Sequence, residues 1–127
     1  MHNAILIDPV ARKITEVQVR KDDGYLADIY KHLECQLLDA VDVRNAGDVI
    51  YVDDEGLSVE NQRYFGWRGH PEPLAGKGLL LGTDAVGEVI SPNFDRAAVI
   101  EHVVWLSPTV INGEVKYVAT DATVTEH

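Results

Sequence analysis

Residues 61–70 carry the side chains in this sequence that are best suited to holding a ligand. Two arginines lie among three large rings in this stretch, with an asparagine before them and a histidine after them. Aromatic faces stack on flat rings, and a guanidinium group binds phosphate or carboxylate through paired hydrogen bonds. The pattern indicates a binding site for a small molecule such as a nucleotide. Its candidate residues are Asn61, Arg63, Tyr64, Trp67, Arg68 and His70. The alternative is a loop that packs its rings on the core and pairs its arginines with surface carboxylates.

Acid–base catalysis is a further hypothesis, in which His70 works with Asp53 or Asp54. It requires these groups to converge in one cleft. Other catalytic signatures are missing from the sequence. There is no Gly-x-Ser-x-Gly motif, and the glycines at 76–78 lack the longer frame and following helix of a phosphate loop. We therefore expect no catalytic residue, and an enzyme is the less favoured reading.

Metal and cofactor sites are not expected either. The five histidines are scattered, and Cys35 is the only cysteine that could join them as a ligand. The acidic run at 53–55 could bind a hard cation, but a solvated turn explains it as well. Cys35 lies on a predicted helix, where burial would make it unreactive.

The charge balance limits the kinds of partner. The chain has 127 residues with 21 acidic and 11 basic side chains, which gives a net charge of -10. Such a surface repels phosphate backbones and anionic membranes, so we expect neither nonspecific nucleic-acid binding nor membrane binding. A single cysteine suits a reducing compartment, and no long apolar run or leader is present. These features favour a cytoplasmic protein.

The N-terminal half predicts strands and one principal helix. Apolar and alternating runs predict a hairpin of strands at 4–8 and 14–19. Apolar residues spaced by three and four predict a helix over 24–36, with Cys35 near its inner edge. Its inner face should carry Leu26, Ile29, Tyr30, Leu33 and Leu37. Strands follow at 38–43 and 48–52, and Leu57 and Val59 could continue the pairing.

The C-terminal half predicts a long structured loop, a central strand and a hairpin. Residues 61–77 show no clear period, and 78–83 are apolar enough for a strand in the middle of a sheet. Residues 91–93 could cap a short helix ending near Ala98, while 100–106 could be a strand or could continue that helix. Asn112-Gly113 predicts a tight hairpin turn, and residues 121–127 are expected to fray.

These elements form one α+β domain over residues 1–127. We expect a mostly antiparallel twisted sheet with one principal helix on one face, plus a C-terminal β-hairpin. That hairpin either extends the sheet or serves as a dimerisation arm.

The order of elements up to Gly82 resembles the domain-of-unknown-function family numbered 3846. The likeness rests on Ile5-Leu6-Ile7-Asp8-Pro9, on the strand and acidic turn at 48–56, and on Asn61-Gln62-Arg63 followed by the strand bounded by Gly76 and Gly82. Residues 1–98 resemble the family core, and 99–120 form an extension. The insertion at 64–73 and the C-terminal hairpin depart from the family pattern. The resemblance implies a phage- or plasmid-borne accessory protein and supplies no catalytic residue.

The leading functional hypothesis is therefore an accessory protein that binds a protein partner or itself, using the hairpin or the ring-rich loop. A binder of nucleotide-like ligands through residues 61–70 and an acid–base enzyme are the alternatives.

Overall fold

A computed structural model of the chain describes residues 1–120. The predicted fraying of 121–127 lies outside the described residues. The elements are β1 (His2–Asp8), β2 (Lys13–Val19), α1 (Tyr25–Leu33), β3 (Leu38–Asp42), β4 (Val49–Asp53), η1 (Gly56–Ser58), β5 (Tyr64–Trp67), β6 (Leu74–Ala75), β7 (Gly78–Thr83), β8 (Val89–Ile90), α2 (Arg96–His102), β9 (Val103–Ile111) and β10 (Glu114–Ala119).

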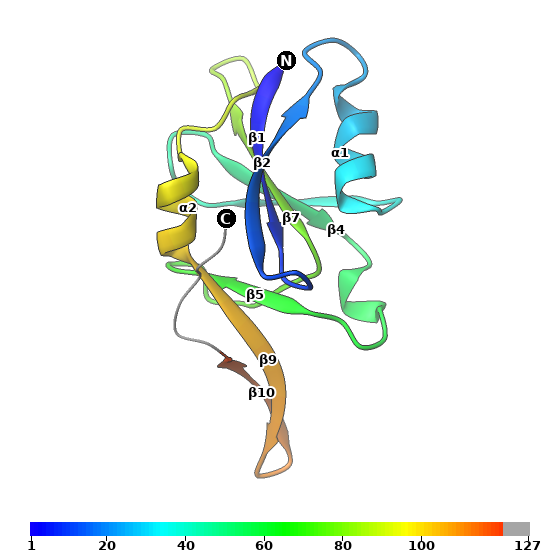
Figure 1. The fold of residues 1–127 in the computed structure, drawn as a ribbon, viewed down its shortest axis with the longest axis vertical. Coiled ribbons are helices and arrows are strands. Elements are labelled where there is room, and N and C mark those ends of the chain that lie inside the picture. The colour runs from blue at the N-terminus through cyan, green and yellow to red at the C-terminus, as the bar shows by residue number, and fades with distance from the viewer. Residues whose placement is uncertain (121–127) are drawn as a thin grey trace.

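The strands form two sheets, and all of their pairings are antiparallel. The main sheet has the order β2-β1-β7-β4-β3, with β8 paired to β7, and the second sheet has the order β10-β9-β5-β6. Helix α1 covers one face of the main sheet, and the second sheet and α2 lie on the other side (Figure 1). The predicted α+β class and the predominance of antiparallel strands are confirmed. The structure adds a second sheet, and the short second helix expected after residues 91–93 is present as α2.

Alternation along the strands divides the core in two. Ile5 and Leu80 point toward Phe65 of the second sheet, whereas Leu79 and Leu81 point toward α1. Strand β7 lies between β1 and β4 with both faces buried, as its apolar sequence predicts. One face of the main sheet therefore packs against α1 and the other against the second sheet. The alternation of side chains along each strand determines which residues face which layer.

Gly78 lets the two sheets approach each other closely. A Cβ atom at this position would lie 2.7 Å from Cζ of Phe65 and 2.9 Å from Cγ2 of Ile50. Phe65 is fully buried, so its ring fills the space that a side chain at position 78 would take. A glycine is needed here for packing between the layers.

The predicted helix over 24–36 is too long. Helix α1 ends at Leu33 because Glu34 adopts a left-handed conformation with φ 54°. Leu26 and Leu37 are 42% and 49% exposed, so the predicted inner face is wrong at these two positions. Leu37 lies beyond the end of the helix and so loses the helical spacing on which the prediction relied. Cys35 is predicted to lie on the helix but follows its end, and it packs against the core as a small apolar side chain.

The expectation of a loop over 61–77 is also wrong, because β5 and β6 lie within this stretch. Residues in β5 alternate between half-buried and buried, the pattern of a strand with one face on a core. Its main partner is β9, almost forty positions further along the chain, so local sequence does not show the pairing. Leu57 and Val59 do not extend a strand, since η1 forms there and both side chains are exposed.

The second helix begins later than predicted. The side chain of Asp95, not residues 91–93, caps α2 by accepting a hydrogen bond of 2.8 Å from the Ala98 N–H. The helix continues to His102 and passes directly into β9 at Val103. The ambiguous stretch 100–106 is thus helix first and strand afterwards. Among the described residues no helix has the length and apolar character needed to cross a membrane.

Asp48 is a fully buried carboxylate that joins the β3–β4 turn to the segment before α2. The backbone N–H groups of Asn93 and Phe94 donate to it at 2.9–3.0 Å, and the amide groups of Asn93 and Asn45 donate at 3.2 and 3.4 Å. A buried charge is tolerated when hydrogen bonds replace its water. This carboxylate fixes where α2 starts relative to the main sheet.

We predict that Asp48→Ala lowers the free energy of unfolding by about 2–4 kcal/mol, because it leaves two buried N–H groups without an acceptor. Asp48→Asn should cost less, since the amide retains one acceptor oxygen. Urea denaturation monitored by tryptophan fluorescence measures both losses. Asp54→Asn, the same change on an exposed turn, is the control and should stay within about 0.5 kcal/mol of the wild type. An Asp48→Ala variant as stable as this control would contradict the assigned role.

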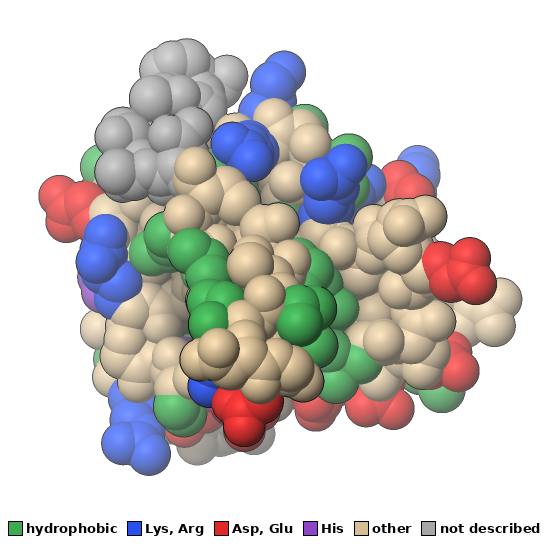
Figure 2. Space-filling model, turned by 90° about the horizontal axis from the view of Figure 1, so that it is seen from below, with side chains coloured by type: hydrophobic (Ala, Val, Ile, Leu, Met, Phe, Trp, Pro, Cys, Tyr) green, Lys and Arg blue, Asp and Glu red, His purple; other side chains and the backbone are tan. Residues whose placement is uncertain are grey.

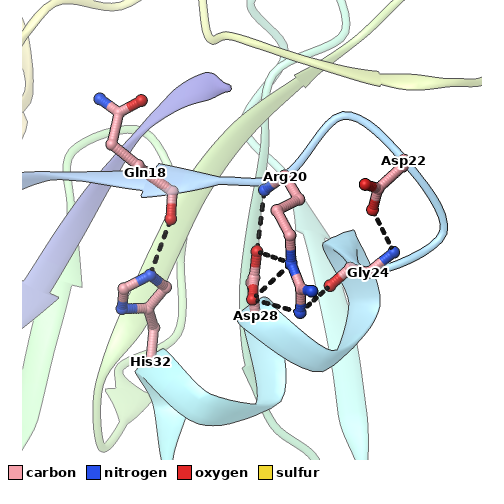
Figure 3. Close-up of polar contacts among 6 residues, drawn as sticks. All are labelled: Gln18, Arg20, Asp22, Gly24, Asp28 and His32. Carbon is pink, nitrogen blue, oxygen red and sulfur yellow. Dashed lines mark hydrogen bonds and ion pairs between the residues drawn. The ribbon is translucent and has the colours of Figure 1, made fainter.

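Arg20 and Asp28 fasten α1 to the end of β2 (Figure 3). The Arg20 Nη2 and Nε atoms lie 2.9 and 3.0 Å from the Asp28 carboxylate oxygens, and the Arg20 N–H donates to the same carboxylate at 2.8 Å. One turn further along, Nε2 of His32 donates to the Gln18 carbonyl at 3.0 Å. Hydrogen bonds from Arg20 hold the pKa of Asp28 below its ordinary value.

We predict a stability difference between the wild type and Asp28→Asn that is present at neutral pH and disappears in acid. A carboxylate whose pKa is lowered by folding stabilises the native state above its unfolded pKa, and loses this effect as the pH falls through the folded pKa. Urea midpoints measured between neutral pH and about pH 2 should therefore converge. Asp23→Asn, a change at a neighbouring exposed carboxylate, is the control and should have the urea midpoint of the wild type at neutral pH. A gap that stays constant down to the lowest pH would refute the assignment.

Candidate functional site

The structure divides the six predicted site residues into separate places. Trp67, Arg68 and His70 line the same hollows, whereas Arg63 and Tyr64 line another hollow of about 120 Å³ at the other end of β5. Asn61 is exposed, with φ 54°, and lines none of these hollows. The separation arises because residues 64–67 are an extended strand, which sends its ends to different surfaces.

The rings of the stretch point to opposite faces of β5. Phe65 and Trp67 point inward, and Trp67 stacks on His102 at 4.8 Å and meets Phe94 edge-on at 5.3 Å. Tyr64 points outward and meets Tyr117 of β10 edge-on at 4.9 Å. Burial raises the pKa of Tyr64, and Tyr117 raises it further. Most of the aromatic surface is thus used by the protein itself.

Arg68 holds the loop at 68–73 against the end of α2. Its backbone N–H donates to the His102 carbonyl at 2.9 Å, and its Nε donates to the Glu101 carbonyl at 2.8 Å. The last carbonyls of a helix lack partners within it and carry partial negative charge, which suits a guanidinium group. Arg68 is exposed and forms no ion pair within the part of the chain that the structure describes.

The 68–73 loop borders three neighbouring hollows, and His70 lines all of them. The largest, about 770 Å³, lies between the 40–44 segment and the 67–71 stretch. Its lining includes Arg44, Arg68 and His70, with Asp42 as the acid, and we call it the arginine hollow. One carboxylate oxygen of Asp42 accepts the Arg44 N–H at 2.7 Å. In a chain with a net charge of -10, this is a local concentration of cationic groups.

Sequence reasoning missed Arg44. It lies in the turn between β3 and β4 with φ 56°, far along the chain from the predicted site. Its side chain is exposed and makes no ion pair among residues 1–120. No motif marks it, because only the packing of the two sheets brings the β3–β4 turn beside the 68–73 loop.

The groups of the acid–base hypothesis share the smallest of the three hollows. His70, Asp53 and Asp54 line a space of about 250 Å³ together with Asp39 and Glu72. No hydrogen bond joins the His70 ring to a carboxylate in the described part of the chain, and one oxygen of Asp53 accepts the Glu55 N–H at 2.9 Å. Within residues 1–120, no three His, Cys, Asp or Glu side chains are grouped to hold a metal ion.

The Cys35 thiol is in an environment that suppresses its reactivity. Burial raises its pKa, and the nearby charge of Asp53 raises it further. The thiolate is the nucleophilic form, so a raised pKa keeps this group protonated near neutral pH.

The hairpin of β9 and β10 projects away from the body of the molecule (Figure 1). Opposed residues in an antiparallel pair share a face, and one face of this hairpin consists of apolar residues along its length. This outer face carries Leu106, Pro108, Val110, Val115, Tyr117 and Ala119. Val110 is 71% and Val115 58% exposed. Figure 2, which views the molecule from the hairpin end, shows hydrophobic side chains gathered around the tip.

The outer face continues into a hollow of about 400 Å³. Leu106, Val115 and Tyr117 line one side of it, and Arg68, His70 and Pro73 line the other. The hairpin and the 68–73 loop therefore border one continuous hollow, with the apolar outer face on one side and Arg68, His70 and Glu72 on the other.

Comparison with known proteins gives one match. A family model described as Domain of unknown function (DUF3846) matches residues 1–103. No curated protein and no solved structure matches the chain. The matched region ends at the first residue of β9, so nearly all of the projecting hairpin lies beyond it.

Proposed function

The chain belongs to the family described as Domain of unknown function (DUF3846), and from that premise we propose that it works by binding a protein partner rather than by catalysis. The proposal includes the setting implied by the sequence resemblance, an accessory protein of a phage or plasmid acting in the cytoplasm. The observation that carries the proposal is the exposed apolar outer face of the hairpin.

The hairpin has the features of a docking surface. Isolated hairpins are marginally stable in water and usually depend on packing along one face. Here the inward-pointing Trp105 at the base is buried in the core, but every residue of β10 is exposed. Contiguous apolar residues on a protruding element mark protein–protein contact sites. We therefore assign partner binding to the outer face.

We predict that introducing charge on the outer face abolishes partner binding. Val110→Glu combined with Val115→Glu should weaken the affinity for the bound protein at least tenfold, because each carboxylate must be desolvated against apolar surface. The tagged chain would capture partners from host cells, and calorimetry with the purified partner would measure the affinity. The control is Val86→Glu, which alters a valine that is 78% exposed in a different loop.

Two results would refute the proposal. One is that neither a second copy of the chain nor another protein binds the wild type. The other is that the outer-face variant binds as well as Val86→Glu does.

A second candidate function rests on the arginine hollow. We infer that this hollow binds a small anion, with a nucleotide as the first class to test, because two guanidinium groups and an imidazole border it. Arginine forks match phosphate oxygens, and two arginines against one carboxylate, that of Asp42, give this hollow an excess of positive charge in an acidic chain. The assignment replaces Arg63 with Arg44 as the second arginine of the binding residues.

We predict that nucleotides raise the melting temperature of the wild type and of Arg63→Ala, and that Arg44→Ala weakens their binding about tenfold. Arg44→Ala removes a side chain that makes no ion pair in the described structure, so the fold should persist. Thermal-shift titration with nucleoside triphosphates and with inorganic phosphate measures the effect. Absence of any shift at millimolar concentration, or equal shifts in both variants, would exclude this site.

A further inference from the structure

We propose that the protein partner is a second copy of this chain, joined by antiparallel pairing of the two β10 strands. This inference rests on the proposed function, because it names a partner of the same hairpin: the second copy pairs with the β10 edge, and the outer faces of the two hairpins then lie side by side. It follows from the hydrogen-bonding pattern, the blocked opposite edge and the charge distribution of the hairpin.

The backbone groups of β10 alternate in direction. The Thr120 N–H donates to the Trp105 carbonyl at 3.0 Å, and the register of the two strands makes this one of the hydrogen-bonded pairs. Such pairs recur at every second residue, so Glu114, Lys116, Val118 and Thr120 bond to β9. The N–H and C=O groups of Val115, Tyr117 and Ala119 then point to the open edge of the sheet, because β10 ends the order β10-β9-β5-β6.

The opposite edge of the hairpin is closed to a partner strand. On β9, the residues whose backbone groups point away from β10 are Leu106, Pro108 and Val110. Those of Leu106 face Tyr64 of β5, and those of Pro108 and Val110 lie beyond the end of β5. Proline has no N–H to donate, and proline on an edge strand is a common means of preventing further pairing. The β10 edge has no proline between Glu114 and Thr120. Strand addition is therefore directed to β10.

The charge distribution favours contact between two copies of the chain at the hairpin. Two copies with a net charge of -10 each repel one another over most of their surfaces. Between Val103 and Ala119, the charged residues are Glu114 and Lys116, which pair with each other at 3.0 Å. The hairpin is thus electrically neutral, and because it projects from the body it can meet its copy with the acidic bodies kept apart (Figure 1).

The register that suits a two-fold axis places Tyr117 opposite Tyr117 of the second copy. Val115 then lies opposite Ala119, Lys116 opposite Val118, and Glu114 opposite Thr120, so pairing runs through the whole of β10. A register centred on Lys116 would instead oppose two like charges, which is unfavourable. In the Tyr117 register, the outer faces of both hairpins join into one apolar surface across four strands. A two-fold contact of this kind requires a surface complementary to itself, as this edge is.

Hydrogen exchange of the full chain, followed by NMR at low and high protein concentration, tests the pairing without altering the sequence. We expect sedimentation to show a dimer that dissociates on dilution through the micromolar range, as is typical of small interfaces. The amides of Val115, Tyr117 and Ala119 should exchange at least tenfold more slowly at high concentration. The amides of Lys116, Val118 and Thr120 should be protected at both concentrations. Raising the ionic strength should strengthen the dimer, because it screens the repulsion between acidic bodies.

Two variants provide an independent test. Val115→Pro removes an N–H that points to the open edge and leaves the bonds to β9 in place, so it should abolish the dimer. Val115→Thr keeps both the N–H and the β-branched shape, so it should still dimerise. Circular dichroism and tryptophan fluorescence, which reports on the buried Trp67 and Trp105, would verify that both variants fold.

The outcomes separate this inference from the proposed function. Three results would each overturn the inference. They are a monomer at millimolar concentration, a dimer in which the amides of Val115, Tyr117 and Ala119 are not protected from exchange, and a dimer that persists in Val115→Pro. If the chain is monomeric but its outer-face variant loses a different protein partner, the proposed function stands and the second copy is excluded. If no protein binds at all, both fail.

Discussion

The buried Asp48 carboxylate sets the relation between the two halves of the molecule. It lies immediately before β4 and accepts hydrogen bonds from the backbone N–H groups of Asn93 and Phe94. These are the two residues that precede Asp95, the cap of α2. Because α2 passes into β9 without a loop, the direction of β9 follows from the place where α2 is anchored. Strand β9 in turn pairs with β5 and presents the hairpin. The Asp48 carboxylate is therefore one of the contacts that position β9 and the hairpin relative to the main sheet.

The position of α2 also determines where the 68–73 loop lies. Its start is held to the last carbonyls of α2 by Arg68, and Trp67 is stacked between His102 and the core. On its other side lies the β3–β4 turn, which carries both Asp48 and Arg44. The Asp48 carboxylate thus supports the turn that borders the arginine hollow, although Asp48 itself does not line the hollow. Acidic groups elsewhere keep the protein highly charged, whereas the hairpin carries no net charge and the arginine hollow has an excess of positive charge.

The boundary of the family match has a structural consequence. Residues 1–103 contain the whole main sheet but only one residue of β9. In this chain, β9 adds Trp105 to the core between the sheets, and its first four residues pair with the whole of β5. The residues beyond the match therefore complete the second sheet at their base and project as a hairpin at their tip. A single pair of strands thus serves both the stability of the fold and the surface proposed for binding.

The sequence alone determined the local elements whose signals lie within a few residues. Short apolar runs predicted β1 and the central strand β7, alternation predicted β2, and Asn112-Gly113 predicted the turn of the hairpin, because each signal depends on neighbouring residues or on turn chemistry. It could not show that β5 is a strand, since its partner β9 is distant in the chain and Gly66 weakens the local preference. It also grouped Arg63 with Arg68, because residues near in sequence were assumed to be near in space. The tertiary structure instead joined Arg44 to Arg68, since a strand separates its own ends while sheet packing brings distant turns together.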